Sequence, residues 1–187
     1  MRQLTEEETR TLFTKLANYC GSELKTLIAG PSGEGQSDQM VFRLQRDRVF
    51  YCSLTQANLA SAIPRANLLS IGTLMGKFTK TGKFRLHITA LAVIAPHARS
   101  KLYIKQNGEM PFLYGGNVVK AHVGRISEET PANSGVIVFS MDDTPLGFGV
   151  TLRSTAELKK LEPTAIFLAR QGDCGEYLRE EDSMFTT

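Results

Sequence analysis

The chain has 187 residues, of which 42% are hydrophobic and 22% charged, a balance typical of a globular protein rather than a disordered one. No apolar run is long enough to span a bilayer, and the polar opening MRQLTEEETR does not fit a secretory signal. We therefore expect a soluble intracellular protein without membrane association. The three cysteines and three histidines lack metal-ligand spacing, which excludes the familiar disulfide frameworks and metal cages.

The charges are unevenly distributed, although the net charge is only +3. Residues 48–108 contain nine lysines and arginines and no carboxylate, whereas residues 109–187 contain seven basic and twelve acidic residues. A stretch of 61 residues without a carboxylate predicts a positive surface for a polyanion, and RNA or DNA fits best. The alternative is that this stretch balances the acidic C-terminal third inside the folded protein.

The first fifty residues predict helices followed by strands. Thr5 to Glu8 form a capping box, and apolar residues then recur at helical spacing up to Gly21. The elements expected after this helix are a short helical turn at 24–28, a mobile glycine-rich loop at 30–38, strands at 40–44 and 49–52, and a helix from Ser53 or Thr55 to Ala62.

A long β-hairpin is expected next, with strands over residues 68–78 and 83–94 joined by a turn at 79–82. A period of two places alternate residues of the return strand on opposite faces, so the apolar set lies on the core. The outward set comprises Lys83, Arg85 and His87, with Lys77 and Lys80 close by across the hairpin. This cluster predicts a binding surface. Its alternative is a solvated edge, where charges prevent unwanted strand pairing.

Short strands dominate the remainder, and we place a domain boundary after residue 98, near the break at Pro96. The expected domains are residues 1–98 and 99–187. Strands are predicted at 101–105, 123–126, 135–140, 147–152, 165–169 and, as an option, 176–178, with turns at 106–108, 142–145 and 171–172. Helices are predicted at 111–122 and 155–161. Strands this short favour a small mixed barrel.

The familiar enzyme signatures are incomplete. Gly147 and Gly149 begin a possible dinucleotide loop, but Leu152 stands where the third glycine is needed. There is no phosphate-binding P-loop and no G-x-S-x-G elbow. We therefore expect no cofactor, no metal and no catalytic residue. A nucleophilic site assembled from distant residues remains the alternative.

Five blocks run through almost the whole chain: MRQLTEEETR, GKFTKTGKFRLHITAL, FLYGGNVVKAHVG, PLGFGV and GEYLR. In this order they resemble the Nip-seven family of large-subunit ribosome-biogenesis factors. The resemblance implies an α+β protein. Its N-terminal part would be a mixed α/β "pre-PUA" domain with a hairpin-rich sheet, and its C-terminal part a PUA pseudo-barrel, an RNA-binding fold.

The resemblance also implies a function. It points to a non-enzymatic RNA-binding assembly factor for pre-rRNA processing and biogenesis of the 60S subunit, resident in the nucleus and nucleolus, with the cytoplasm as a further option. The implied partners are pre-ribosomal RNA, pre-60S assembly factors and exosome subunits. We expect a monomer that accepts single-stranded, uridine-rich RNA. The alternatives are a PUA-containing translation-initiation adaptor, an accessory protein of an RNA-modifying enzyme, and a protein-interaction module.

Two basic surfaces are candidate sites. The family's basic PUA surface carries over onto Lys120, Arg153, Lys159 and Lys160. Lys159 and Lys160 are equally well explained as the exposed face of a helix at 155–161. The hairpin residues Lys77, Lys80, Lys83 and Arg85 form a second surface, for RNA or for a protein partner. Phe112, Tyr114 and Tyr177 would stack on bases if exposed, but aromatic residues are also typical of a barrel core.

Overall fold

The computed structural model describes residues 1–29, 39–64 and 66–181. The chain divides into two compact units, one built from Met1–Ala17 and Gly21–His97, the other from Asn18–Cys20 and the residues from Ala98 onward. Arg65 and the glycine-rich loop predicted at 30–38 lie outside the described residues. Within the described ranges, no helix has both the length and the apolar character needed to cross a membrane.

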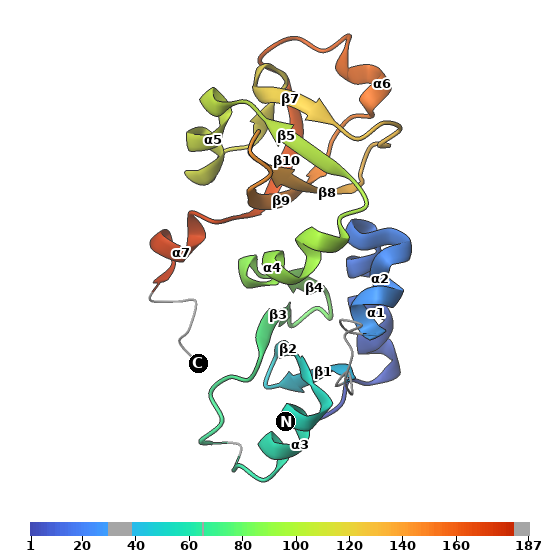
Figure 1. Cartoon of the computed structure of the whole chain (residues 1–187), viewed down its shortest axis with the longest axis vertical. Helices are drawn as coiled ribbons and strands as arrows, with labels where there is room; N and C mark the ends of the chain where they lie inside the picture. The colour runs from blue at the N-terminus through green and yellow to red at the C-terminus, as the bar shows by residue number, and fades with distance from the viewer. Residues whose placement is uncertain (30–38, 65, 182–187) are drawn as a thin grey trace. The chain divides into compact units, whose positions relative to one another are not determined.

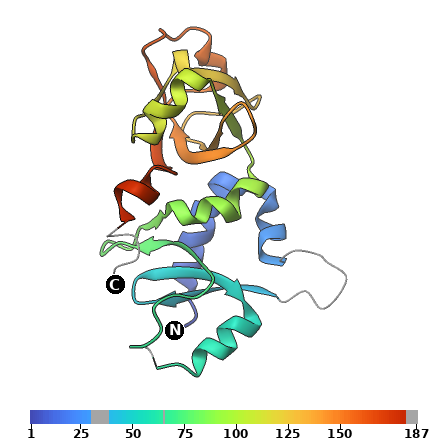
Figure 2. The same ribbon diagram turned by 60° about the vertical axis from the view of Figure 1, so that its left-hand side comes forward.

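The first unit is built on a four-stranded antiparallel sheet of order β1-β2-β3-β4, in which every strand pairs with its neighbour in sequence. Its elements are α1 (Glu6–Cys20), η1 (Gly21–Glu23), α2 (Leu24–Ala29), β1 (Met40–Gln45), β2 (Arg48–Ser53), α3 (Leu54–Ser61), β3 (Thr73–Phe78), β4 (Phe84–Leu86), η2 (Ile88–Ala90), α4 (Leu91–Ile94) and η3 (Ala95–His97). Helix α1 packs on this sheet through Phe13, whose ring lies 5.8 Å from that of Phe42 (Figures 1 and 2). The helices and strands predicted before residue 62 are confirmed to within about two residues.

The capping box of α1 also holds the start of the chain. The Thr5 hydroxyl accepts from the Glu8 backbone N–H at 3.3 Å, and the Glu8 carboxylate accepts from the Thr5 N–H at 2.8 Å. Arg2 donates to both oxygens of the same carboxylate, at 2.8 and 2.6 Å, while its backbone pairs with Leu44 in β1. The hydrogen bond from Arg2 lowers the pKa of Glu8 to about 2. One carboxylate therefore caps the helix and ties the N-terminal residues to the sheet.

The predicted long hairpin is much shorter in the structure. Strand β3 begins at Thr73 rather than residue 68, and β4 ends at Leu86, so the return strand predicted to reach residue 94 is wrong. The backbone N–H of His87 donates to the carbonyl of Met75 at 3.0 Å, and the Thr89 hydroxyl donates to the carbonyl of Leu74. The chain then turns into η2 and α4, where Ile88, Leu91 and Ile94 are buried. These three residues have a helical spacing of three, which the apparent alternation before them concealed.

The second unit is a six-stranded sheet of order β6-β10-β9-β8-β5-β7, antiparallel except between β5 and β8. Its elements are β5 (Lys101–Ile104), α5 (Gln106–Leu113), β6 (Val118–Val119), η4 (Lys120–His122), β7 (Val123–Ile126), β8 (Gly135–Phe139), β9 (Pro145–Thr151), α6 (Thr155–Leu158), β10 (Ile166–Asp173) and α7 (Glu176–Arg179). Phe112, Phe148 and Phe167 are among its fully buried side chains. The strands curl into a near-barrel (Figure 1), and the predicted α+β class is confirmed.

The helix predicted at 111–122 is wrong. The helix is α5, which begins at Gln106 in the segment predicted to be a turn, and its successor is a short strand, β6. A side chain at Gly108 would place a Cβ 2.6 Å from the Cβ of His122, so glycine lets the helix pack closely on η4. The helix ends at Leu113, with Tyr114 as its C-cap. Gly115 follows with a φ of +93°, and the N–H of Gly116 donates back to the carbonyl of Pro111 at 2.9 Å.

The end of the unit also differs from the prediction. Strand β10 passes through the turn predicted at 171–172 with a register shift between Arg170 and Gly172, and residues 176–179 form α7 instead of a strand. The fully buried carboxylate of Asp173 accepts from the N–H of Gly175 and from the guanidinium groups of Arg170 and Arg179. These bonds end the strand and hold the helix against it.

Gly149 of β9 lies where β9 and β10 approach each other closely. A Cβ there would lie 2.4 Å from the carbonyl oxygen of Ala169 in β10 and 2.4 Å from Leu168 Cδ2. We expect Gly149→Ala to lower the free energy of unfolding by roughly 1–3 kcal/mol, as overpacking does. Gly124→Ala is the matched control, because its Cβ would lie 3.0 Å from the sulfur of Met141, which can move, and 3.2 Å from the carbonyl oxygen of Tyr103, well beyond the 2.4 Å contacts at Gly149. Denaturant unfolding measures both, and equal midpoints would contradict this account.

Glu8 gives a prediction for acid stability. Because its pKa is lowered in the folded state, its ionised carboxylate stabilises the fold above about pH 4.5. This contribution is lost as the pH falls from 4.5 towards 2, through the folded pKa. Glu8→Gln keeps a residue that can complete the capping box but removes the charge. The thermal midpoints of the two proteins should differ at pH 6 and converge near pH 2; a constant difference would contradict the role of Arg2.

Candidate nucleic-acid interface

The hairpin of β3 and β4 brings its predicted cations onto one exposed surface. Lys77 lies directly opposite Arg85 in the strand register, and Phe78 lies opposite Phe84. The two phenyl rings are 5.1 Å apart and Phe84 is buried, so the aromatic face points to the core and the cationic face to solvent. Lys80 in the turn and Lys83 beside it are also exposed. Within the described residues, no carboxylate forms an ion pair with any of these four cations.

A third strand extends this surface. Arg48 of β2 is the register partner of Lys77, so Arg48, Lys77 and Arg85 form a row across three neighbouring strands. Adjacent strands lie about 4.8 Å apart, and like charges that face each other across strands destabilise a sheet. The sequence analysis did not assign Arg48 to a site. The pairing of β2 with β3 joins segments far apart in sequence. The only sequence signal for Arg48 was therefore its position in residues 48–108, which contain no carboxylate.

His87 does not belong to the row that the sequence predicted. It follows the end of β4 and is only partly exposed. Its Nδ1 lies 3.0 Å from the hydroxyl of Thr89, at the point where the chain turns into η2. The alternation that placed His87 beside Arg85 stops one residue earlier, because the strand itself stops there.

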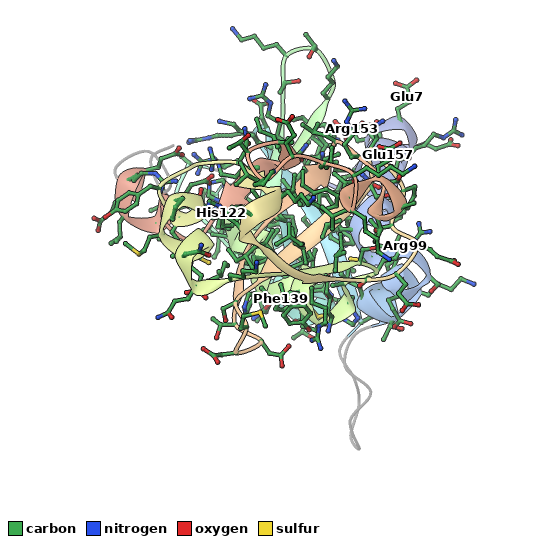
Figure 3. The ribbon with its side chains drawn as sticks, turned by 90° about the horizontal axis from the view of Figure 1, so that it is seen from above. Glu7, Arg99, His122, Phe139, Arg153 and Glu157 are labelled. Atoms are coloured by element: carbon green, nitrogen blue, oxygen red, sulfur yellow. The ribbon has the colours of Figure 1, made fainter. Side chains whose placement is uncertain are left out.

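The second basic surface lies at one end of β9 and around α6. Arg153 follows β9, while Lys159 and Lys160 follow the last residue of α6, and all three side chains are exposed. The helix ends at Leu158, so neither lysine lies on the face of a longer helix, as one alternative supposed. Figure 3 shows Arg153 and Glu157 on the same side of the unit, away from His122. No ion pair to these three cations occurs among residues 1–29, 39–64 and 66–181.

Lys120 has a different environment from the other predicted residues. It lies in η4 and is partly buried, and its ammonium donates to the carbonyl oxygen of Lys159 at 3.2 Å and to that of Leu161. Its charge therefore faces the backbone that carries Lys159 and Lys160. This contact makes Lys120 a positioning residue for the neighbouring basic segment.

The aromatic residues divide between core and surface. Phe112 is 1% exposed and belongs to the core, whereas Tyr114 is 73% exposed and Tyr177 42%. The sequence analysis missed a pair on the outer face of β5 and β8, where the rings of Tyr103 and Phe139 stack at 5.6 Å. Arg125 lies over Tyr103, 4.2 Å from its centroid, and Lys101 lies 5.3 Å from the centroid of Phe139. Both aromatic residues are buried, Tyr103 at 9% and Phe139 at 6% exposed, and the cations over their rings stabilise the pair.

Comparison with known proteins agrees with both units. Residues 1–88 match the family model of the NIP7/UPF0113 pre-PUA domain, and residues 100–182 match that of the UPF0113 PUA domain. The chain is 58% identical over 185 residues to the 60S ribosome subunit biogenesis protein nip7 of Schizosaccharomyces pombe, covering 99% of this chain and 100% of that protein. It is 55% identical over 186 residues to the 60S ribosome subunit biogenesis protein NIP7 of Saccharomyces cerevisiae, covering 100% of both.

Solved structures agree on the fold. A PUA domain protein from Aeropyrum pernix K1 matches with a TM-score of 0.58 at 14% identity, over 96% of this chain and 89% of that one. A hypothetical protein from Pyrococcus horikoshii OT3 matches with a TM-score of 0.59 at 12% identity, over 95% and 96%. At such low identity these likenesses show the fold alone.

The cross-strand row predicts an unusual response to charge reversal. Arg85→Glu should raise the thermal midpoint, because it replaces repulsion from Lys77 with attraction. Lys83→Glu changes the net charge equally but lies outside the paired residues of β4, so its effect should be smaller. Thermal unfolding followed by circular dichroism measures both variants. A lower midpoint for Arg85→Glu, or equal shifts for both, would show that repulsion in the row is negligible.

Proposed function

The chain belongs to the NIP7 family of 60S ribosome subunit biogenesis proteins, and from this premise we propose that it binds RNA during assembly of the large ribosomal subunit. The observation that carries the proposal is exposed positive charge on both units that forms no ion pair with any carboxylate among the described residues. Cations of this kind displace the counterions condensed on RNA, which supplies affinity without base recognition. We propose pre-ribosomal RNA as the ligand, in single-stranded form and with uridine-rich stretches accepted.

Each unit contributes one surface in this proposal. Residues 1–98 would form the pre-PUA domain and present Lys77, Lys80, Lys83 and Arg85. Residues 99–187 would form the PUA domain and present Arg153, Lys159 and Lys160, with Lys120 holding the lysine segment in place. Lys77 and Arg85 lie on paired strands, and the other cations lie in turns directly beside strands or a short helix. This placement restricts their backbone positions and favours contact with successive phosphates.

We propose that the chain acts without catalysis. Burial raises the pKa of the Cys20 thiol to about 11, and it also raises the pKa values of Cys52 and Cys174. Since the thiolate is the nucleophile, these three cysteines suit packing rather than covalent chemistry. No cluster of three potential metal ligands occurs within the ranges that the structure covers.

The relatives' names support the setting. Both fungal relatives are named as 60S ribosome subunit biogenesis proteins, so we propose residence in the nucleus and nucleolus, where the precursor of that subunit is made. Pre-60S assembly factors and exosome subunits are the proposed protein partners, and a monomer is the proposed state. Sedimentation of the tagged chain with precursor large subunits would support this setting over a role in translation initiation.

The PUA surface is tested by reversing two charges. Lys159→Glu with Lys160→Glu should weaken binding to a uridine-rich oligoribonucleotide and reduce the slope of log affinity against log salt by about 1.4, or about 0.7 for each lost phosphate contact. Fluorescence anisotropy at several salt concentrations measures both quantities. Arg10→Glu with Lys25→Glu is the matched control, with the same change in net charge on α1 and α2. Unchanged affinity in the first variant, or an equal loss in the control, would remove this surface from the proposal.

A further inference from the structure

A small hollow in the first unit combines cations, apolar side chains and a buried amide. It has a volume of about 170 Å³. It is lined by Gln45, Phe50 and Leu69, together with the cations Arg46, Arg48 and Lys77. In the strand register Gln45 pairs with Arg48 and Arg48 pairs with Lys77, so the hollow lies at one end of the cationic row.

Gln45 is the unusual residue among those that line the hollow. It is the last residue of β1 and is only 5% exposed. The amide nitrogen donates to the carbonyl of Leu68, and this acceptor fixes which end of the amide is the NH₂ group. The Oε1 atom is then left as a buried acceptor with no donor among the described residues. Buried polar atoms of folded proteins nearly always have a partner, so this oxygen points to a missing donor.

The charges around the hollow favour an anion. Among its lining residues, Arg46 and Lys77 are exposed and form no ion pair within the described residues, and the one carboxylate is that of Asp47 in the turn between β1 and β2. The turn is held by the N–H of Phe78, which donates to the carbonyl of Asp47 at 2.8 Å. Arg46 has a φ of +55°, a left-handed backbone conformation that residues other than glycine rarely adopt. The turn thus keeps a strained arginine beside two further cations.

The size and the apolar surfaces limit what can enter. A cavity of about 150 Å³ is enough for one benzene ring, so this hollow admits a single flat ring and little more. Phe50 and Leu69 supply the apolar contact that the face of such a ring needs. A ligand that fits has a ring, a hydrogen-bond donor on its edge, and a nearby negative charge.

We propose that this hollow receives one nucleotide of a bound RNA strand. The phosphate would contact Lys77, and an amine or imino group on the base edge would donate to Gln45 Oε1. Bases splayed out of single-stranded RNA present such edges, whereas the carboxylate of an acidic peptide side chain is an acceptor only. The inference rests on the proposed RNA-binding function, because it assigns one nucleotide position within that contact.

Nuclear magnetic resonance on the full ¹⁵N-labelled chain can test the site. Cytidine 5′-monophosphate, whose base is a single ring with an exocyclic amine, should shift the side-chain amide signals of Gln45 and the backbone signal of Lys77. Inorganic phosphate should shift Lys77 without Gln45, and cytidine should act more weakly than the monophosphate on both. The inference is overturned if the monophosphate leaves the Gln45 amide unmoved, or if phosphate alone moves it as much.

A variant separates the acceptor from the charges. Gln45→Met keeps the length of the side chain but removes Oε1, and should weaken binding of the monophosphate at least fivefold, as followed at Lys77. Gln106→Met, on the exposed start of α5, is the matched control and should leave binding unchanged. If Gln45→Met fails to fold, Lys77→Ala serves instead, with binding followed at the Gln45 amide signals, because the exposed Lys77 side chain makes no packing demand. Unchanged binding in Gln45→Met, or in Lys77→Ala where that variant serves, would overturn the inference.

Two further measurements keep this inference distinct from the proposed function. If the oligoribonucleotide binds and depends on Lys159 and Lys160 while the Gln45 signals stay unmoved, the hollow is not a nucleotide site, yet the proposed function stands. If no RNA binds at any salt concentration, the proposed RNA-binding function and the nucleotide site fail together. Hexaglutamate is the probe for a protein partner, and a shift of the Gln45 amide by this peptide but not by the monophosphate would overturn the nucleotide assignment.

Discussion

Repulsion between cations on neighbouring strands is the constraint that governs the first unit. Arg48, Lys77 and Arg85 face each other across β2, β3 and β4, and a sheet gains nothing in stability from such a row. The opposite face offsets this cost by burying Phe84 against Phe78. The apolar face therefore stabilises a row of like charges, and in the proposed function a bound polyanion would reduce the repulsion between them.

The number of basic residues overstates the positive charge that is available. Arg170 and Arg179 are bound to the buried carboxylate of Asp173, and Arg2 is bound to Glu8. Lys120 is directed at two backbone carbonyls. These residues stabilise the fold through the contacts just described, so they contribute little to the binding of a ligand. The hairpin cations and those around the end of α6 form no ion pair among the described residues, so the two proposed surfaces follow from local pairing rather than from net charge.

The two surfaces differ in how they are held. On the hairpin, pairing between strands fixes the backbone at Lys77 and Arg85, and the spacing of these two cations follows from the sheet. Around α6, a helix of four residues has little stability of its own, and the segment after it depends on Lys120. The first surface is thus the more rigid, and it is also the one that lies beside a hollow with an unused acceptor.

Sequence alone was enough to predict α1, the first two strands and α3, because a capping box, alternation and a terminating proline act over a few neighbouring residues. It also placed the cations of the hairpin, since a tight turn brings its own flanks together. Only the tertiary structure decided where β4 stops, that α5 begins at Gln106, and that Arg48 joins Lys77. These outcomes depend on burial and on pairing between segments far apart in the chain, such as the close packing of Gly108 on His122, and no local pattern carries that information.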